Sequence, residues 1–158
     1  MCAEHRTHPV ETVTVPGRPR SPGPRSPAEV REAVRHAFEG ARRSRSRETV
    51  AGDRDTVAGD EAVGDALLVA SELTTNAMLH GGGVTQFEVT LDDWDVRLSV
   101  SDRSGELPTS ARHIDDRGFM RVGGHGWPIV CHLARDITIS ELDAGGKRIT
   151  AVVPLSPR

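Results

Sequence analysis

The chain of 158 residues is poor in cysteine, contains no tyrosine and has only one lysine. Its two cysteines, Cys2 and Cys131, form no CxxC pair, which excludes a disulfide framework and leaves no recognisable zinc site. No run approaches the roughly 18 apolar residues that span a membrane, and no apolar stretch follows Met1 as in a signal peptide. These absences predict a cytoplasmic protein with no membrane partner.

Charge is unevenly distributed along the chain. Residues 1–47 carry 10 basic and 5 acidic side chains, whereas residues 48–158 carry 10 basic and 18 acidic ones. An acidic body argues against direct binding of nucleic acid, because phosphate contacts need clustered lysine and arginine. The use of 19 arginines against one lysine is typical of codon bias toward G and C, and the sequence alone gives it no functional meaning.

The first 27 residues differ from the rest in composition. They hold six of the ten prolines and show no sustained periodicity, which predicts a flexible or polyproline-like segment. Within this segment, residues 10–15 alternate as a short edge strand would, although a disordered tail explains them equally well. We therefore divide the chain into a flexible segment, 1–27, and one domain, 28–158.

The domain shows alternating helix and strand patterns. Ser26 and Pro27 suit the start of a helix whose arginine-rich end, after residue 41, reads as a solvated turn more readily than as a nucleic-acid patch. The segment 49–53 is repeated at 56–60, as expected of a loop that tolerates insertion. The later elements are predicted at these ranges: helices 61–80 and 126–135, and strands 86–91, 95–100, 137–141 and 147–153. This order predicts an α+β two-layer sandwich, a mainly antiparallel sheet with helices on one face.

Three polar features stand out from this background. At helical spacing, Glu72, Asn76 and His80 follow one another at one-turn intervals along the helix 61–80. A polar stripe on a buried helix needs partners, which a ligand with oxygens and a metal would supply; an ordinary solvent-facing stripe is the alternative. Asp102 ends a strand and is followed by a turn with Gly105, and a glycine-rich stretch, 122–126, leads into the helix 126–135.

Together, these features resemble the GHKL superfamily of ATP-binding domains, most closely the bacterial anti-sigma-factor serine/threonine kinases. Residues 72–81 (ELTTNAMLHG) are similar to the family's N-box, and 102–105 (DRSG) to its first glycine box. Residues 123–130 (GGHGWPIV) are similar to its second glycine box, and 145–149 (GGKRI) to its closing strand. The resemblance implies a Bergerat-type ATP-binding fold over roughly residues 28–155.

The resemblance also implies roles for individual residues. Asn76 would bind magnesium, Glu72 would be the general base, and Asp102 would accept the adenine amino group with Gly105 beside the base. The remaining nucleotide contacts implied are those of His80, Gly124, His125, Gly126 and Thr150. Residues 103–122 would form a lid over the nucleotide.

Two positions depart from the family pattern. Arg148 replaces the threonine that the family usually has after Gly-Gly-Lys. Thr150, two residues later on the same strand face, offers a hydroxyl in its place. After the second glycine box, Trp127-Pro128 replaces two aliphatic residues. The expected function is still an ATP- and Mg²⁺-binding serine/threonine kinase. It would phosphorylate an anti-sigma-factor antagonist protein, bind a sigma factor, or do both, and homodimerisation remains open. The alternative is a nucleotide-binding module, weakly active or inactive, that only sequesters its partner.

Overall fold

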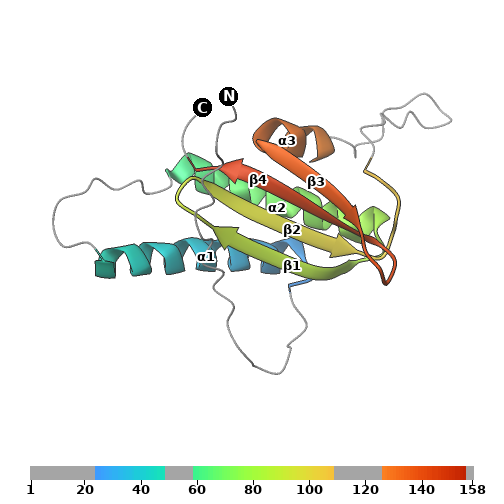
Figure 1. The fold of residues 1–158 in the computed structure, drawn as a ribbon, viewed down its shortest axis with the longest axis horizontal. Coiled ribbons are helices and arrows are strands. Elements are labelled where there is room, and N and C mark those ends of the chain that lie inside the picture. The colour runs from blue at the N-terminus through green and yellow to red at the C-terminus, as the bar shows by residue number, and fades with distance from the viewer. Residues whose placement is uncertain (1–23, 49–58, 109–125, 156–158) are drawn as a thin grey trace, which may run out of the picture.

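The computed structural model describes residues 24–48, 59–108 and 126–155. In chain order the elements are α1 (Pro27–Glu48), α2 (Asp60–His80), β1 (Val84–Leu91), β2 (Asp95–Asp102), α3 (Gly126–Leu133), β3 (Asp136–Glu141) and β4 (Lys147–Pro154). The four strands form an antiparallel sheet in the order β1-β2-β4-β3, and the helices lie against it (Figure 1). The predicted α+β class is confirmed.

Helix α1 begins where Ser26 and Pro27 predict it. The carboxylate of Glu29 accepts hydrogen bonds from the backbone N–H of Arg25 (2.8 Å) and of Ser26 (3.0 Å), and Ser26 Oγ accepts one from the Glu29 N–H (3.3 Å). This reciprocal pattern is a capping box, which satisfies N–H groups that the helix itself cannot. The bond from Arg25 and then those from Ser26 hold the pKa of Glu29 below its ordinary value.

Alternation along the strands gives the sheet two different faces. The inner face, against the helices, carries apolar rows: Phe87, Val100, Ile149 and Ile139; Val89, Leu98, Ala151 and Ile137; Leu91, Val96 and Val153. The outer face carries mostly polar rows, such as Gln86, Ser101, Arg148 and Ser140. Because neighbouring residues of a strand point to opposite faces, register alone decides which side chains meet the helices.

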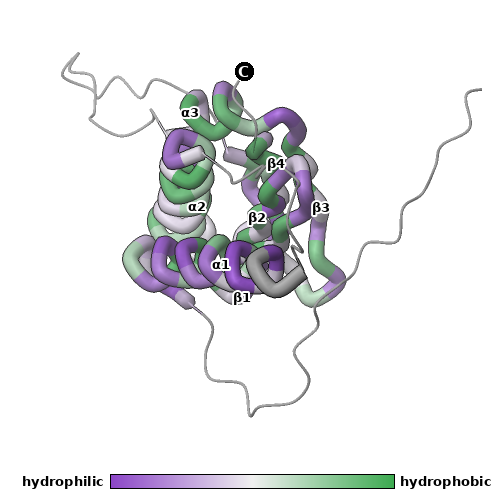
Figure 2. Tube along the Cα trace, turned by 90° about the vertical axis from the view of Figure 1, so that its left-hand side faces the viewer, coloured by the Kyte–Doolittle hydropathy of each residue, from purple (hydrophilic) through white to green (hydrophobic). Residues whose placement is uncertain are grey.

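Helix α2 packs against the inner face with α3 beside it, while α1 lies along α2 and β1 (Figure 2). The core side of α2 is formed by small and aliphatic residues. Its buried residues are Ala62, Ala66, Val69, Ala70, Leu73, Thr74 and Ala77. Helical periodicity over 61–80 predicts that Met78 lies on the apolar side of the helix with Ala70 and Ala77, but Met78 is 47% exposed, so that prediction is wrong. The reason is angular: Met78 lies about 100° around the helix from Ala77, outside the buried arc.

Element ends differ slightly from the predicted ones. Strand β2 continues two residues beyond the expected end, so Asp102 is itself paired, opposite Lys147 of β4. Helix α3 ends at Leu133 instead of residue 135. The predicted strand at 10–15 and most of the predicted flexible segment 1–27, with the loop 49–58, lie outside the described residues. No helix in the described parts of the chain has the length and apolar character needed to cross a membrane.

Candidate functional site

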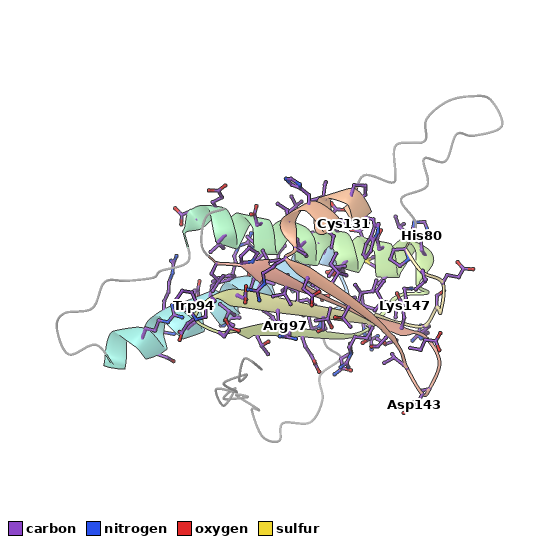
Figure 3. All side chains as sticks on the ribbon, turned by 45° about the horizontal axis from the view of Figure 1, so that its top comes forward. His80, Trp94, Arg97, Cys131, Asp143 and Lys147 are labelled. Atoms are coloured by element: carbon purple, nitrogen blue, oxygen red, sulfur yellow. The ribbon has the colours of Figure 1, made fainter. Side chains whose placement is uncertain are left out.

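The polar stripe of α2 lies at the edge of the buried face of the helix. Glu72 and Asn76 are half-buried, whereas His80, the last residue of α2, is exposed. This position is intermediate between the two interpretations of the sequence: the stripe neither faces the core nor points fully into solvent. Figure 3 shows His80 at the end of the helix, at the same end of the molecule as Lys147.

The first residue of α3 lies directly on the Glu72 side chain. A Cβ atom at Gly126 would overlap Glu72 Oε2 and come within 3.1 Å of the carboxyl carbon, so any larger residue would require the Glu72 side chain to move. The N-terminus of a helix carries partial positive charge, which favours a carboxylate beside it. The second glycine-rich segment and the polar stripe, about 50 residues apart in the chain, are thus adjacent in the fold.

Asn76, one turn after Glu72, holds an unsatisfied polar atom. Its Nδ2 is buried and has no hydrogen-bond partner among the described residues. A buried polar group without a partner typically costs about 1–3 kcal/mol, so native structures keep one where something else satisfies it. Rotation of the amide brings Oδ1 to the same place, which gives the position either a donor or an acceptor.

Asp102 lies where the end of α2, the end of β2 and the start of β4 meet. We call the residues that meet there the Asp102 junction: Gly81, Asp102, Ser104, Gly146 and Lys147. A Cβ atom at Gly81 would overlap the Asp102 carboxylate, and one at Gly146 would overlap its backbone carbonyl. The Arg103 N–H donates to the Gly81 carbonyl (2.9 Å), which fastens the end of α2 to the end of β2. The junction therefore forms one end of the inner face, beyond the last apolar row.

Lys147 is the residue of the junction that sequence reasoning missed. Its Nζ lies 2.9 Å from Asp102 Oδ2 and 3.1 Å from Asp102 Oδ1, and it donates to the Ser104 carbonyl at 3.1 Å. Both side chains are buried, with 6% and 5% of their surface exposed. The available signal was composition: this is the one lysine among 19 arginines.

Thr150 lies on the opposite face of the sheet from Asp102. Its hydroxyl is hydrogen-bonded to that of Ser99 (2.8 Å) in an outer row. Arg148 shares this face, where it donates to Ser101 Oγ (3.1 Å) and Gln86 Oε1 (2.8 Å). The structure therefore does not bring Thr150 together with Asp102, and Arg148, in place of the family's threonine, does not obstruct the junction.

The other predicted contacts are only partly covered. Gly105 is exposed, three residues after Asp102, with open space where a Cβ atom would stand. Gly124 and His125, and the lid residues from 109 onward, lie outside the described residues. The described site thus consists of the α2 stripe with Gly126 and the Asp102 junction.

The donor set of this site suits magnesium held together with phosphate oxygens. Mg²⁺ at such sites takes one or two protein oxygens and completes its shell with water and phosphate. Asn76 can supply one such oxygen, and its unsatisfied amide nitrogen is consistent with an additional ligand. In the described ranges, no three His, Cys, Asp or Glu side chains gather as a self-sufficient metal site.

Comparison with known proteins adds no family to this description. No protein-family model matches the chain, and no curated protein matches it. The functional assignment therefore depends on the residues and their arrangement.

Proposed function

We propose that this chain is a Bergerat-type domain that binds ATP and Mg²⁺ and acts as a serine/threonine kinase of the anti-sigma-factor type. Its substrate would be an anti-sigma-factor antagonist protein, and a sigma factor is a second candidate partner. The resemblance of three separate motifs supports the family, and the α+β fold is compatible with it. In this proposal, ATP lies between α2 and the end of the sheet formed by β2 and β4.

One observation carries the proposal: residues from distant motifs lie close to a buried amide nitrogen that has no partner in the described part of the chain. Gly126 touches Glu72, Asn76 follows one turn later, and Gly81, at the end of the same helix, touches Asp102. A purely structural helix would gain stability from an apolar residue at Asn76. The amide, one turn after a carboxylate that touches a helix start, supports a ligand with phosphate oxygens and a cation.

The chemistry follows from these positions. Asn76 would hold Mg²⁺, which neutralises phosphate charge when bound. The Glu72 carboxylate would take the proton of the acceptor serine hydroxyl while the serine oxygen forms a bond to the γ-phosphorus. The bond from that phosphorus to the β–γ bridging oxygen breaks, and ADP leaves. The neighbouring N-terminus of α3 favours negative charge, so it would support both the carboxylate and the phosphates.

Phosphoryl transfer tests the proposal. The chain is incubated with ATP labelled at the γ-phosphate and with a panel of anti-sigma-factor antagonist proteins. We expect label on a serine of one partner, and a rate about 10²–10⁴-fold lower for Glu72→Gln, which keeps the size of the side chain but takes no proton. Transfer at the wild-type rate by Glu72→Gln would exclude Glu72 as the base.

A second function is favoured by one specific feature, the ion pair of Lys147 with Asp102. Because the carboxylate expected to accept adenine already has a partner, nucleotide binding would be weak, and the domain would act mainly by sequestering a partner protein. In the same assay this candidate predicts stable partner binding without transferred label. Release of free phosphate alone would instead indicate an ATPase.

A further inference from the structure

The ammonium group of Lys147 has no unused hydrogen-bond donor. A lysine carries three N–H donors, and three oxygens lie within 3.1 Å of Nζ: Asp102 Oδ1, Asp102 Oδ2 and the Ser104 carbonyl. The side chain is buried on the inner face, in the row beyond the apolar ones. Lys147 is therefore part of a closed group, in contrast to the usual solvated lysine of a strand end.

The Asp102 carboxylate is equally enclosed. Oδ1 accepts from the Ser104 N–H (3.0 Å) and from Lys147, and Oδ2 accepts from Lys147. Gly81 closes another side, since even a Cβ atom there would overlap the carboxylate. A donor arriving from a ligand therefore competes with the ammonium for this carboxylate.

We propose that Lys147 is a specificity-determining residue that competes with the purine amino group for Asp102. This inference rests on the proposed nucleotide site. In the free protein Lys147 occupies the acceptor, so ATP binds through its base only after the ammonium has withdrawn. A lysine can withdraw because its charge stands on a flexible four-carbon stem.

The competition lowers base discrimination as well as affinity. A carboxylate alone favours adenine, whose amino group donates, over guanine, whose carbonyl in that position accepts. The Asp102–Lys147 pair offers an acceptor and a donor side by side. Guanine satisfies this pair with its carbonyl and its ring N–H, so ATP and GTP bind with similar affinity.

A neighbouring arginine provides a matched control. Arg148 lies on the same strand, carries the same charge and points to the outer face, away from Asp102. The substitutions Lys147→Met and Arg148→Met therefore remove one positive charge each but only the first frees the carboxylate. Calorimetric titration of the full chain with MgATP, MgGTP and magnesium tripolyphosphate measures base and phosphate recognition separately.

We expect Lys147→Met to bind ATP about 10- to 100-fold more tightly than the wild type, the range of one hydrogen bond to a charged acceptor. The ratio of ATP to GTP affinity should rise with it, while tripolyphosphate affinity should match that of Arg148→Met. Unchanged or weaker ATP binding by Lys147→Met, with tripolyphosphate still bound, overturns the competition but leaves the nucleotide site. Failure of every form to bind ATP or tripolyphosphate overturns both.

A second variant keeps the test decisive if Lys147→Met does not fold. Lys147→Gln is neutral, and its amide still donates one hydrogen bond to Asp102. We expect a smaller gain in ATP affinity, on the order of a few-fold, because a neutral donor competes less strongly than an ammonium. No gain with Lys147→Gln would also overturn the proposal.

Discussion

Two neighbouring cations of β4, Lys147 and Arg148, lie on opposite faces of the sheet and in different environments. On the inner face, Lys147 and Asp102 form an ion pair of 2.9 Å with both side chains almost wholly buried. On the outer face, Arg148 donates to Ser101 and Gln86 and lies 3.9 Å from Glu88, with 33% and 49% of the two charged side chains exposed. One step along β4 thus separates a desolvated pair from a hydrated network.

Burial decides what each contact contributes. An exposed ion pair typically contributes about 0–1 kcal/mol, because water screens and competes with it. A buried pair is expensive to form, and loss of one partner leaves the other charge uncompensated, at a cost of about 3–5 kcal/mol. The buried Lys147–Asp102 pair has a high desolvation cost and lies beside the candidate site, which favours a role in that site. The outer hydrogen bonds of Arg148 need no role beyond covering the sheet.

The largest expected effect comes from the glycine that lies against Asp102. Gly146 has φ +93°, and a Cβ atom there would overlap the Asp102 carbonyl; Gly145, with φ +84°, has nothing within 4 Å. We expect Gly146→Ala to destabilise the fold by more than about 4 kcal/mol, and Gly145→Ala by about 1–3 kcal/mol from its backbone conformation alone. Urea unfolding of both variants measures this difference, and equal losses would mean that the junction is not tightly packed.

Removal of one cation from each face gives the next largest effect. Lys147→Met should lower the free energy of unfolding by about 3–5 kcal/mol, and Arg148→Met by less than about 1 kcal/mol. Asp102→Asn combined with Lys147→Met removes both charges and should recover most of the loss. Similar losses for the two single variants would remove the difference between the faces.

Much of this arrangement was predictable from local sequence, and the exceptions share a cause. Ser26 and Glu29 define the start of α1, and alternation defines the strands, because both signals depend on residues close together in the chain. The pairing of Asp102 with Lys147 depends on register between β2 and β4, 45 residues apart, which no local pattern specifies.

The same cause explains the outcome for the predicted ligand contacts. Glu72 and Asn76 share a helix, so their one-turn spacing was predictable, and α2 confirms it. Thr150 was proposed as a substitute for a threonine at 148, but alternation places both positions on the outer face. The site residue on the inner face of β4 is Lys147.

The contrast between the site and the outer face of the sheet also predicts different effects on ATP binding for two polar residues, Asn76 and Thr150. Asn76→Ala should abolish the magnesium dependence of ATP binding with little change in stability, since its Nδ2 has no partner to lose among the described residues. Thr150→Val should leave ATP binding unchanged and cost about 0.5–1.5 kcal/mol for its bond to Ser99. Calorimetry with and without Mg²⁺ separates the two, and an effect of Thr150→Val on ATP would return this residue to the site.

The smallest expected effect is that of an exposed carboxylate. Backbone hydrogen bonds hold the pKa of Glu29 below its ordinary value, so its contribution is present above the unfolded-state pKa and is lost as pH falls through the folded-state pKa. Glu29→Gln should therefore reduce stability slightly near pH 7 and have less effect in acid. Thermal melts of wild type and variant across this pH range measure it, and a difference that grows in acid would contradict the assignment.

The most direct measurement uses Lys147 as the only lysine of the chain. An amine-reactive reagent modifies this side chain and the N-terminus alone, so mass spectrometry of one peptide reports whether Lys147 is held by Asp102. We predict modification at least about tenfold slower than that of the same lysine in the urea-unfolded chain, because reaction requires local opening, and faster modification when MgATP displaces the ammonium. Modification as fast in the folded, ligand-free protein as in the unfolded chain, or further protection by MgATP, would contradict the account.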